Sequence, residues 1–295
     1  SILSSILLKK NYEVHGISRK KKKLNLSKLK ISNKIKVHIL RKLDKKKIIK
    51  ILNKSFDEIY FLGGQSNVFN SFTSGQETYE SQIKPVKLLL NFILNQKGKK
   101  SKFLYAASSE MFGEKKKREK LNEGTIKDPV SPYGLSKLIS YEIIKQYRHT
   151  YNIPVCSAIL FNHESHLRPD LYVLKKITSF ILKINSRKKT KLKIGNINIK
   201  RDWGWSEDFM EACNLILKNN KIDDFIIATG KTVSLKTMIK IAFKQHDLNW
   251  RSYIKIDKSL FRKFDIKENY ADNSKIKKVL GWKPKNNYKN IISKI

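Results

Sequence analysis

Short apolar segments alternate with helical segments over the first half of this sequence, and that alternation constrains the possible fold more than any other feature. Strands that alternate with helices form a parallel sheet with helices on both faces. The sequence therefore predicts an α/β fold with a doubly wound parallel sheet. The expected strands are residues 13–17, 37–40, 58–62, 102–107 and 155–161, and the expected helices are 2–9, 46–52, 85–94 and 133–147.

Beyond about residue 165 the pattern becomes less regular. Strands are expected at residues 191–194 and 224–228, and helices at 173–184, 206–218 and 234–246. We interpret residues 1–165 as one domain and residues 166–295 as mainly a smaller, interleaved domain over the same crevice. Some segments of this second part are expected to return to the first.

Small and polar residues follow three of the expected strands at the points where these strands end. They are residues 63–66 (GGQS), 108–110 (SSE) and 162–163 (NH). In open parallel sheets, ligands bind in the crevice beyond the carboxyl ends of the strands. We therefore expect one shared site built from these three strand ends, although each segment taken alone also suits an ordinary loop.

Tyr133 and Lys137 are four residues apart in an expected helix, so their side chains lie on one face, one turn apart. The pKa of a tyrosine is near 10, and a neighbouring ammonium group lowers it toward the range in which a general base is efficient. The pair is therefore typical of a base that takes a proton from an alcohol. The same spacing also suits a half-buried tyrosine beside a solvated lysine, so the surroundings must decide between the two.

The composition argues against several other classes of protein. Only two cysteines are present, Cys156 and Cys213, and no close Cys/His spacing occurs, which disfavours a disulfide framework and a structural zinc site. No apolar run approaches the roughly 18 residues that span a bilayer. The N-terminal segment lacks the basic start and the cleavage site of a secretory signal. We expect a cytoplasmic protein with no metal and no membrane partner.

The formal net charge of +38 suggests attraction to polyanions. The Lys and Arg residues are, however, spread over the whole chain, with runs at 19–23 and 115–118 in expected loops or helix ends. No zinc finger, RNA-recognition signature or basic zipper accompanies these runs. We interpret the charge as a solvated surface and expect no specific nucleic-acid partner, while non-specific polyanion binding stays open as an alternative.

Five further segments make the interpretation of the crevice more specific. They are LFNHES at 160–165, LRP at 167–169, KRDWGW at 200–205, DDFIIATG at 223–230 and LGWKP at 280–284. Together with Ser108, Tyr133 and Lys137, they resemble the GDP-mannose 4,6-dehydratase family of the extended short-chain dehydrogenases/reductases. The similarity runs along the whole chain. It implies a Rossmann-like domain that binds NADP over residues 1–165, and a domain that binds the GDP-sugar mainly over residues 166–295.

The resemblance also implies a reaction and its catalytic residues. Members of the family dehydrate GDP-mannose to GDP-4-keto-6-deoxymannose, and bound NADP carries a hydride from C4 to C6. Tyr133 matches the base for the C4 hydroxyl, Lys137 matches the residue that lowers the pKa of that base, and Ser108 matches a hydroxyl that bonds the sugar. Glu110 matches the acid/base group that removes the C5 proton and helps water leave from C6.

Further positions match cofactor and substrate contacts of the family. The positions that match cofactor contacts are Arg19, Leu62, Gly63, Gly64, Gln65, Ser66, Lys137, His163 and Arg168. Arg19 corresponds to the arginine that meets the 2′-phosphate of NADP. The positions that match contacts to GDP-mannose are Asn162, Lys176, Arg201 and Arg262. Arginine suits a diphosphate, because a guanidinium group binds phosphate oxygens through two parallel hydrogen bonds.

The sequence departs from the family pattern at several places. Ser1 aligns directly after the family's glycine-rich turn, so we expect the first strand and the phosphate-binding glycines to be absent from this sequence. Residues 40–43 lack the Asp-Leu pair that many members place beside the adenine. His166 stands where proline is usual, and Leu171 and Leu174 replace more polar residues. These changes leave open a shift in substrate.

Two other functions stay open from the sequence alone. A sugar-nucleotide 4-epimerase or reductase would share the Tyr133–Lys137 pair, but an epimerase would not need Glu110, because epimerisation removes no C5 proton. A catalytically silent protein that binds polyanions would need none of these residues. The family forms homo-oligomers, so we expect a homodimer or homotetramer assembled through helices near residues 77–96 and 133–150. The final deoxyhexose of the pathway does not follow from the sequence.

Overall fold

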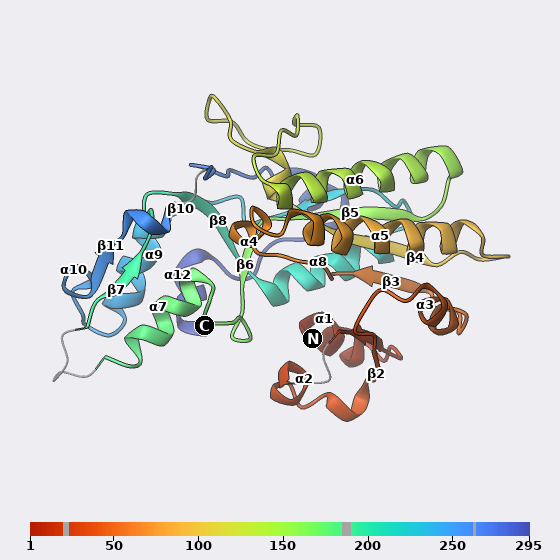
Figure 1. The fold of residues 1–295 in the computed structure, drawn as a ribbon, viewed down its shortest axis with the longest axis horizontal. Coiled ribbons are helices and arrows are strands. Elements are labelled where there is room, and N and C mark those ends of the chain that lie inside the picture. The colour runs from red at the N-terminus through yellow and green to blue at the C-terminus, as the bar shows by residue number, and fades with distance from the viewer. Residues whose placement is uncertain (20–23, 185–189, 262–263) are drawn as a thin grey trace.

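Figure 1 shows the fold of the chain as a computed structural model. The structure describes residues 1–19, 24–184, 190–261 and 264–295. Two features expected from the sequence therefore fall partly or wholly outside the described residues: most of the basic run at 19–23, and Arg262 of the expected substrate site.

Four parallel strands form the central sheet. In spatial order they are β3 (Glu58–Phe61), β4 (Lys102–Ser108), β5 (Val155–Leu160) and β9 (Phe225–Ile227). All residues of β4 except the first, and all of β5 except the last, are buried. Strands of a parallel sheet read as continuous apolar runs because helices cover both of their faces. The prediction of a parallel sheet built from alternating strands and helices is confirmed.

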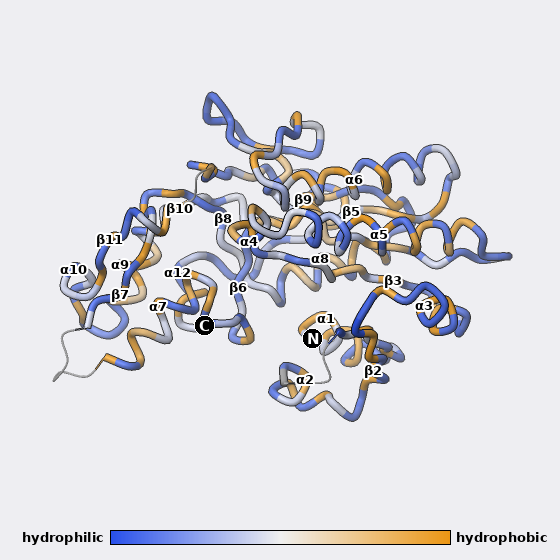
Figure 2. Tube along the Cα trace, in the orientation of Figure 1, coloured by the Kyte–Doolittle hydropathy of each residue, from blue (hydrophilic) through white to orange (hydrophobic). Residues whose placement is uncertain are grey.

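Helices pack on both faces of this sheet (Figure 1). On one face α5 (Gly75–Leu94) packs against α6 (Pro132–Tyr151), and on the other α8 (Ser206–Lys218) packs against α1 (Ile2–Lys9). Hydrophobic and hydrophilic residues alternate along α5 and α6 (Figure 2). In α5 the buried positions Val86, Leu89, Leu90 and Ile93 recur at helical spacing, so one stripe of the helix faces the core.

A second, two-stranded parallel sheet lies beside the first. It contains β1 (His15–Ser18) and β2 (Lys36–Ile39), with α2 (Leu24–Lys28), the 3₁₀ turn η1 (Ser32–Lys34) and α3 (Lys45–Leu52) around it. β1 does not pair with β3. The segments that contain β1 and β3 contact each other through side chains. The Tyr12 hydroxyl donates to Glu58 at 3.2 Å, and the His15 and Phe56 rings lie 4.9 Å apart. The single sheet expected from the sequence is therefore divided between β1 and β3.

The C-terminal half adds two small sheets (Figure 1). One has the order β10 (Thr232–Ser234), β8 (Lys200–Trp205), β6 (Asn162–Glu164), and the other pairs β7 (Leu192–Ile194) with β11 (Ile254–Ile256). The helices here are α7 (Val173–Ile181), α9 (Leu235–Lys244), α10 (Trp250–Tyr253), α11 (Ser274–Leu280) and α12 (Tyr288–Ile291), with the 3₁₀ turns η3 (Lys258–Leu260) and η4 (Ile292–Lys294). The short helix α4 (Val68–Ser71) precedes α5.

Two hydrophobic clusters form the interior. The larger one joins the central sheet to residues from much later in the chain, including Phe209 of α8, Ile276 of α11 and Trp282. The smaller one packs α7 and α9 around Trp203 and Trp205 of β8. The chain thus returns to the central sheet after it has entered the C-terminal part.

Some elements differ from the sequence-based expectation. The helix that contains residues 85–94 begins ten residues earlier, at Gly75, and continues through Pro85. A proline inside a helix removes one backbone hydrogen bond and crowds the preceding turn, yet α5 continues on both sides of Pro85. The segment KRDWGW at 200–205, which the sequence marked only as a motif, forms the central strand β8 of its sheet.

Candidate active site

Tyr133 lies in the first turn of α6, where the local sequence determines its position. Ser131 caps the helix, since its Oγ accepts a hydrogen bond from the Gly134 amide at 3.0 Å. Pro132 occupies the first helical position, which suits proline because its φ is already helical. Ser108, the last residue of β4, lies close enough to the buried Tyr133 phenol to influence its pKa.

Burial dominates the ionisation of this site. It raises the pKa of Tyr133 to about 12, although the neighbouring Ser108 hydroxyl acts in the opposite direction. Burial also lowers the pKa of Lys137 to about 7. Lys137 Nζ donates to the Ala106 carbonyl at 2.7 Å and lies 5.7 Å from the centre of the Tyr133 ring. Apolar surroundings disfavour the charged form of both groups, so burial is the main cause of both pKa shifts.

Glu110 lies beside this pair in the 3₁₀ turn η2 (Ser109–Phe112). Its amide donates to Ser108 Oγ at 3.3 Å. Its carbonyl oxygen approaches α6 so closely that a Cβ on Gly134 would lie 2.7 Å from it. The partly exposed Glu110 side chain lies near enough to Tyr133 to raise the pKa of the phenol. The structure therefore brings Ser108, Glu110 and Tyr133 together, with Lys137 one turn further along α6.

The GGQS segment after β3 forms a tight loop held by α5. Gly64 has a φ of +98°, and a Cβ there would lie 2.2 Å from Gln82 Nε2. Gln82 donates to the Gln65 carbonyl at 2.8 Å, and the Gln65 amide donates to Ser81 Oγ at 3.1 Å. Only glycine combines this positive φ with so close a neighbour. Leu62 and Gly63 precede this turn, and Leu62 is exposed.

The segment after β6 closes against the same loop. Arg168 forms an ion pair with the buried Glu164 at 3.0 Å, and its guanidinium lies 3.7 Å from the centre of the Tyr172 ring. The Tyr172 hydroxyl lies 3.1 Å from Ser66 Oγ. Arg168 also lowers the pKa of Tyr133, as one of its weaker influences. Ser66 and Arg168, both expected at the cofactor, are thus linked through Tyr172.

His163 lies in β6 with its ring packed 5.0 Å from the Phe209 ring. Burial lowers its pKa to about 4, so the imidazole is neutral at neutral pH. Nδ1 lies 2.9 Å from the Phe161 carbonyl oxygen and therefore carries the proton, which leaves Nε2 as an acceptor. Asn162, the first residue of β6, is partly exposed, and Arg19 is exposed directly after β1.

The residues expected on the substrate side are engaged in contacts within the protein. Arg201 is buried and donates to the Lys200 and Ile266 carbonyls at 2.9 and 2.6 Å, and to Asp265 at 3.0 Å. Lys176 donates to the Lys193 carbonyl at 3.1 Å, between α7 and β7. The structure therefore does not join these two side chains to the Ser108–Tyr133 cluster.

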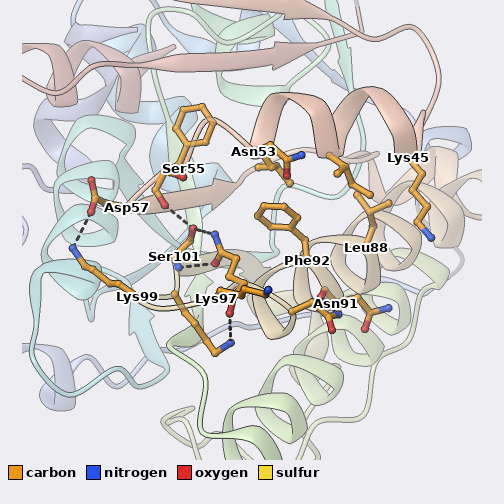
Figure 3. Close-up of a pocket in the computed structure, with 16 residues that line it drawn as sticks. Lys45, Asn53, Ser55, Asp57, Leu88, Asn91, Phe92, Lys97, Lys99 and Ser101 are labelled. Atoms are coloured by element: carbon orange, nitrogen blue, oxygen red, sulfur yellow. Dashed lines mark hydrogen bonds and ion pairs between the residues drawn. The ribbon is translucent and has the colours of Figure 1, made fainter.

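A cavity of about 840 Å³ lies elsewhere, between α3 and α5 (Figure 3). Its wall includes Asp57, just before β3, and Ser101, just before β4. These positions mark the amino ends of the strands, whereas ligands of open α/β sheets bind at the carboxyl ends. The polar cluster around Tyr133, and not this cavity, is therefore the candidate active site.

The whole sequence, residues 1–295, matches the family described as GDP-mannose 4,6 dehydratase. The chain belongs to the GDP-mannose 4,6-dehydratase family. GDP-mannose 4,6 dehydratase 1 of Arabidopsis thaliana is 34% identical over 305 residues, which cover 99% of this chain and 84% of the plant protein. GDP-mannose 4,6 dehydratase of Homo sapiens is 32% identical over 313 residues, covering 97% of this chain and 84% of the human protein.

Solved structures confirm the family's fold in this chain. A UDP-glucuronic acid 4-epimerase from Bacillus cereus, in complex with UDP-glucuronic acid and NAD, matches with a TM-score of 0.85 at 20% identity over 99% of this chain and 92% of its own. A dTDP-glucose 4,6-dehydratase from Bacillus anthracis, in complex with NAD, matches with a TM-score of 0.85 at 15% identity over 99% and 89%. At such identities these structures establish the fold alone.

Sequence analysis missed several residues that shape this site. Gln82, Tyr172 and the buried Asn269 belong to no motif, and their hydrogen-bond partners at the site lie 17, 106 and 160 positions away in the sequence. Their roles depend on tertiary packing, which leaves no periodic signal. Among the described residues, no group of three or more His, Cys, Asp or Glu side chains is placed to hold a metal ion. No helix in the described part of the chain is long and apolar enough to cross a membrane.

Proposed function

We propose that this protein converts GDP-mannose to GDP-4-keto-6-deoxymannose and water. The observation that carries the proposal is the cluster of Ser108, Glu110 and Tyr133 beside Lys137, in a chain that belongs to the GDP-mannose 4,6-dehydratase family over its whole length. An alcohol oxidation needs a base at the hydroxyl, and a dehydration needs a second acid/base group at the neighbouring carbon. The cluster supplies both.

The residues at these strand ends fit a nicotinamide cofactor. The glycine turn at Gly64 follows β3 and the neutral His163 follows β5, while Lys137 lies against β4, and the backbone at Gly64 leaves no room for a side chain. When bound there, a nicotinamide supplies an acceptor and later a donor of hydride. Arg19, exposed after β1, would favour the 2′-phosphate of NADP over the free hydroxyl of NAD.

Each proton in the reaction has a residue to carry it. Tyr133 takes the proton of the C4 hydroxyl as C4 is oxidised, and Ser108 hydrogen-bonds the same oxygen. The resulting ketone makes the C5 hydrogen acidic, and Glu110 removes it. One of the two collected protons leaves with the C6 oxygen as water, and the other returns to C5 when C6 receives the hydride. The electrons balance within the sugar, so no external oxidant is needed.

The GDP moiety requires cationic and amide groups on the C-terminal side. Asn162, Lys176, Arg201 and Arg262 are proposed for this role. A guanidinium has five N–H groups, and Arg201 makes three hydrogen bonds among the described residues. Those bonds hold its plane in one orientation, which suits recognition of a phosphate.

We also infer a homodimer or homotetramer in the cytoplasm, with α5 and α6 in the contact between subunits. Leu135 and Tyr151 of α6 leave apolar surface exposed on this part of the chain. Sedimentation equilibrium of the purified protein tests this assembly, and a single species with the mass of one chain would contradict it.

The proposed activity is tested by incubating the protein with GDP-mannose and NADP and following the sugar by NMR. A methyl signal for C6 together with a keto carbon at C4 is expected. In parallel incubations with UDP-glucose and dTDP-glucose we expect no product. A C4 epimer that retains its C6 hydroxyl would instead identify a sugar-nucleotide epimerase, and would overturn the proposal.

A further inference from the structure

Asn269 connects the C-terminal part of the chain to the turn that carries Glu110. It is fully buried, and its Nδ2 donates to Ser109 Oγ at 3.0 Å across 160 positions of sequence. Ser109 is itself buried and immediately precedes Glu110 in η2. The backbone of Asn269 is also held, because its amide donates to the Lys200 carbonyl at 3.2 Å and its carbonyl accepts from Thr232 Oγ1 at 3.0 Å.

Stability alone does not account for an asparagine at this position. Its Oδ1 is buried and has no hydrogen-bond partner among the described residues. A buried polar group that is only half satisfied is less favourable than an apolar side chain of similar size. The directional bond to Ser109 is therefore the feature that only a polar residue supplies here.

The segment around Asn269 runs between the expected substrate side and the catalytic turn. At one end, Arg201 donates to the Ile266 carbonyl. At the other, the Leu121 amide donates to the Tyr270 carbonyl at 2.8 Å. Asn269 lies between these two hydrogen bonds, which hold the backbone that positions its side chain at Ser109.

We propose that Asn269 is a positioning residue, which holds Ser109 so that η2 presents the Glu110 carboxylate to the C5 hydrogen of the substrate. Three contacts then determine where Glu110 lies: Ser108 Oγ on its amide, Gly134 against its carbonyl, and Asn269 through Ser109. The first two come from the central domain. Only the third comes from the C-terminal part, on the substrate side. This inference rests on the proposed dehydratase function.

Asn269→Ala tests the proposal through the individual steps of the reaction. A small displacement of a catalytic group strongly lowers the rate of the step that it catalyses. We therefore expect kcat to fall about 10- to 100-fold with little change in KM. With GDP-mannose deuterated at C5, the isotope effect on kcat should rise, because removal of that proton becomes limiting. With deuterium at C4, the isotope effect should fall.

Asn273→Ala is the matched control, because Asn273 is also buried and donates to the Ala228 carbonyl at 2.7 Å, away from Glu110. Both variants lose a buried hydrogen bond, but only Asn269→Ala should shift the isotope effects. Ser109→Ala should reproduce the Asn269→Ala effect on kcat, and the double variant should be no slower than either, since one bond is removed in all three.

Hydrogen exchange gives a readout that needs no substrate. Amides of residues 109–113 should exchange faster in Asn269→Ala than in Asn273→Ala. Equal exchange rates together with unchanged isotope effects would overturn the positioning role. If the unaltered protein forms no product, the proposed function fails instead, and the two failures are thereby distinguished.

Discussion

At the scale of single residues, the site is controlled by burial more than by the charge of its lysine. The pKa of Tyr133 stands at about 12 and that of Lys137 at about 7, and desolvation is the main cause of both shifts. A phenol with so high a pKa keeps its proton at neutral pH, and only a change in its surroundings lowers that pKa. For Tyr133 to act as the proposed base, its pKa must fall when substrate and cofactor bind.

The shift of Lys137 makes the stability of the protein depend on pH. The folded-state pKa of about 7 lies below the usual value of 10.5, so between these pH values the unfolded chain binds a proton that the folded chain does not. The free energy of unfolding should therefore rise with pH across this window, by at most about 1.4 kcal/mol per pH unit. Urea unfolding of the protein and of Lys137→Met at pH 7 to 9.5 measures this effect. Parallel pH dependences in the two proteins would contradict it.

At the scale of elements, one carboxylate joins α6, β5 and β9. Asp224 accepts two hydrogen bonds from Arg148 of α6, at 2.8 and 2.6 Å, and one from the Ser157 amide of β5 at 2.7 Å. All donor partners of this buried group come from other elements. Because α6 carries Tyr133 at its far end, this contact also fixes the helix that bears the base.

Removing the Asp224 carboxylate should destabilise the fold strongly. Asp224→Ala removes the carboxylate that accepts two hydrogen bonds from the largely buried Arg148 guanidinium, and we expect a loss of about 3–5 kcal/mol in the free energy of unfolding. Asp223→Ala is the matched control, since Asp223 is more exposed and lies 3.9 Å from Arg148. Chemical unfolding monitored by circular dichroism compares the two. Similar losses in both variants would argue against the special role of Asp224.

The loop after β3 requires a glycine at position 64. In Gly64→Ala the new methyl group would meet the buried Gln82 side chain at a φ of +98°, so we expect a loss of about 1–3 kcal/mol or more and weaker cofactor binding. Gly98→Ala is the control. Gly98 has a φ of +68° but open space around it, so this substitution measures the cost of backbone strain alone. Thermal unfolding should rank Gly64→Ala well below Gly98→Ala, and the reverse order would refute this account of the loop.

At the scale of the whole molecule, local patterns predicted the central strands and the cluster at their carboxyl ends. The apolar runs at β4 and β5 and the Tyr133–Lys137 spacing are encoded in neighbouring residues, so sequence alone is sufficient for them. The use of Arg201 for internal hydrogen bonds depends on contacts between distant segments. Such contacts leave no periodic pattern, which is why they could not be predicted.

In the proposed reaction Tyr133 and Glu110 act in sequence on one sugar, so that the hydrogen removed from C4 returns at C6. The most direct measurement uses GDP-mannose that carries deuterium at C4, with NMR of the product. We expect deuterium in the C6 methyl group with the unaltered protein, and no deoxy product with Tyr133→Phe or Glu110→Gln. Deuterium that stays at C4, or a labelled product that persists in Glu110→Gln, would contradict it.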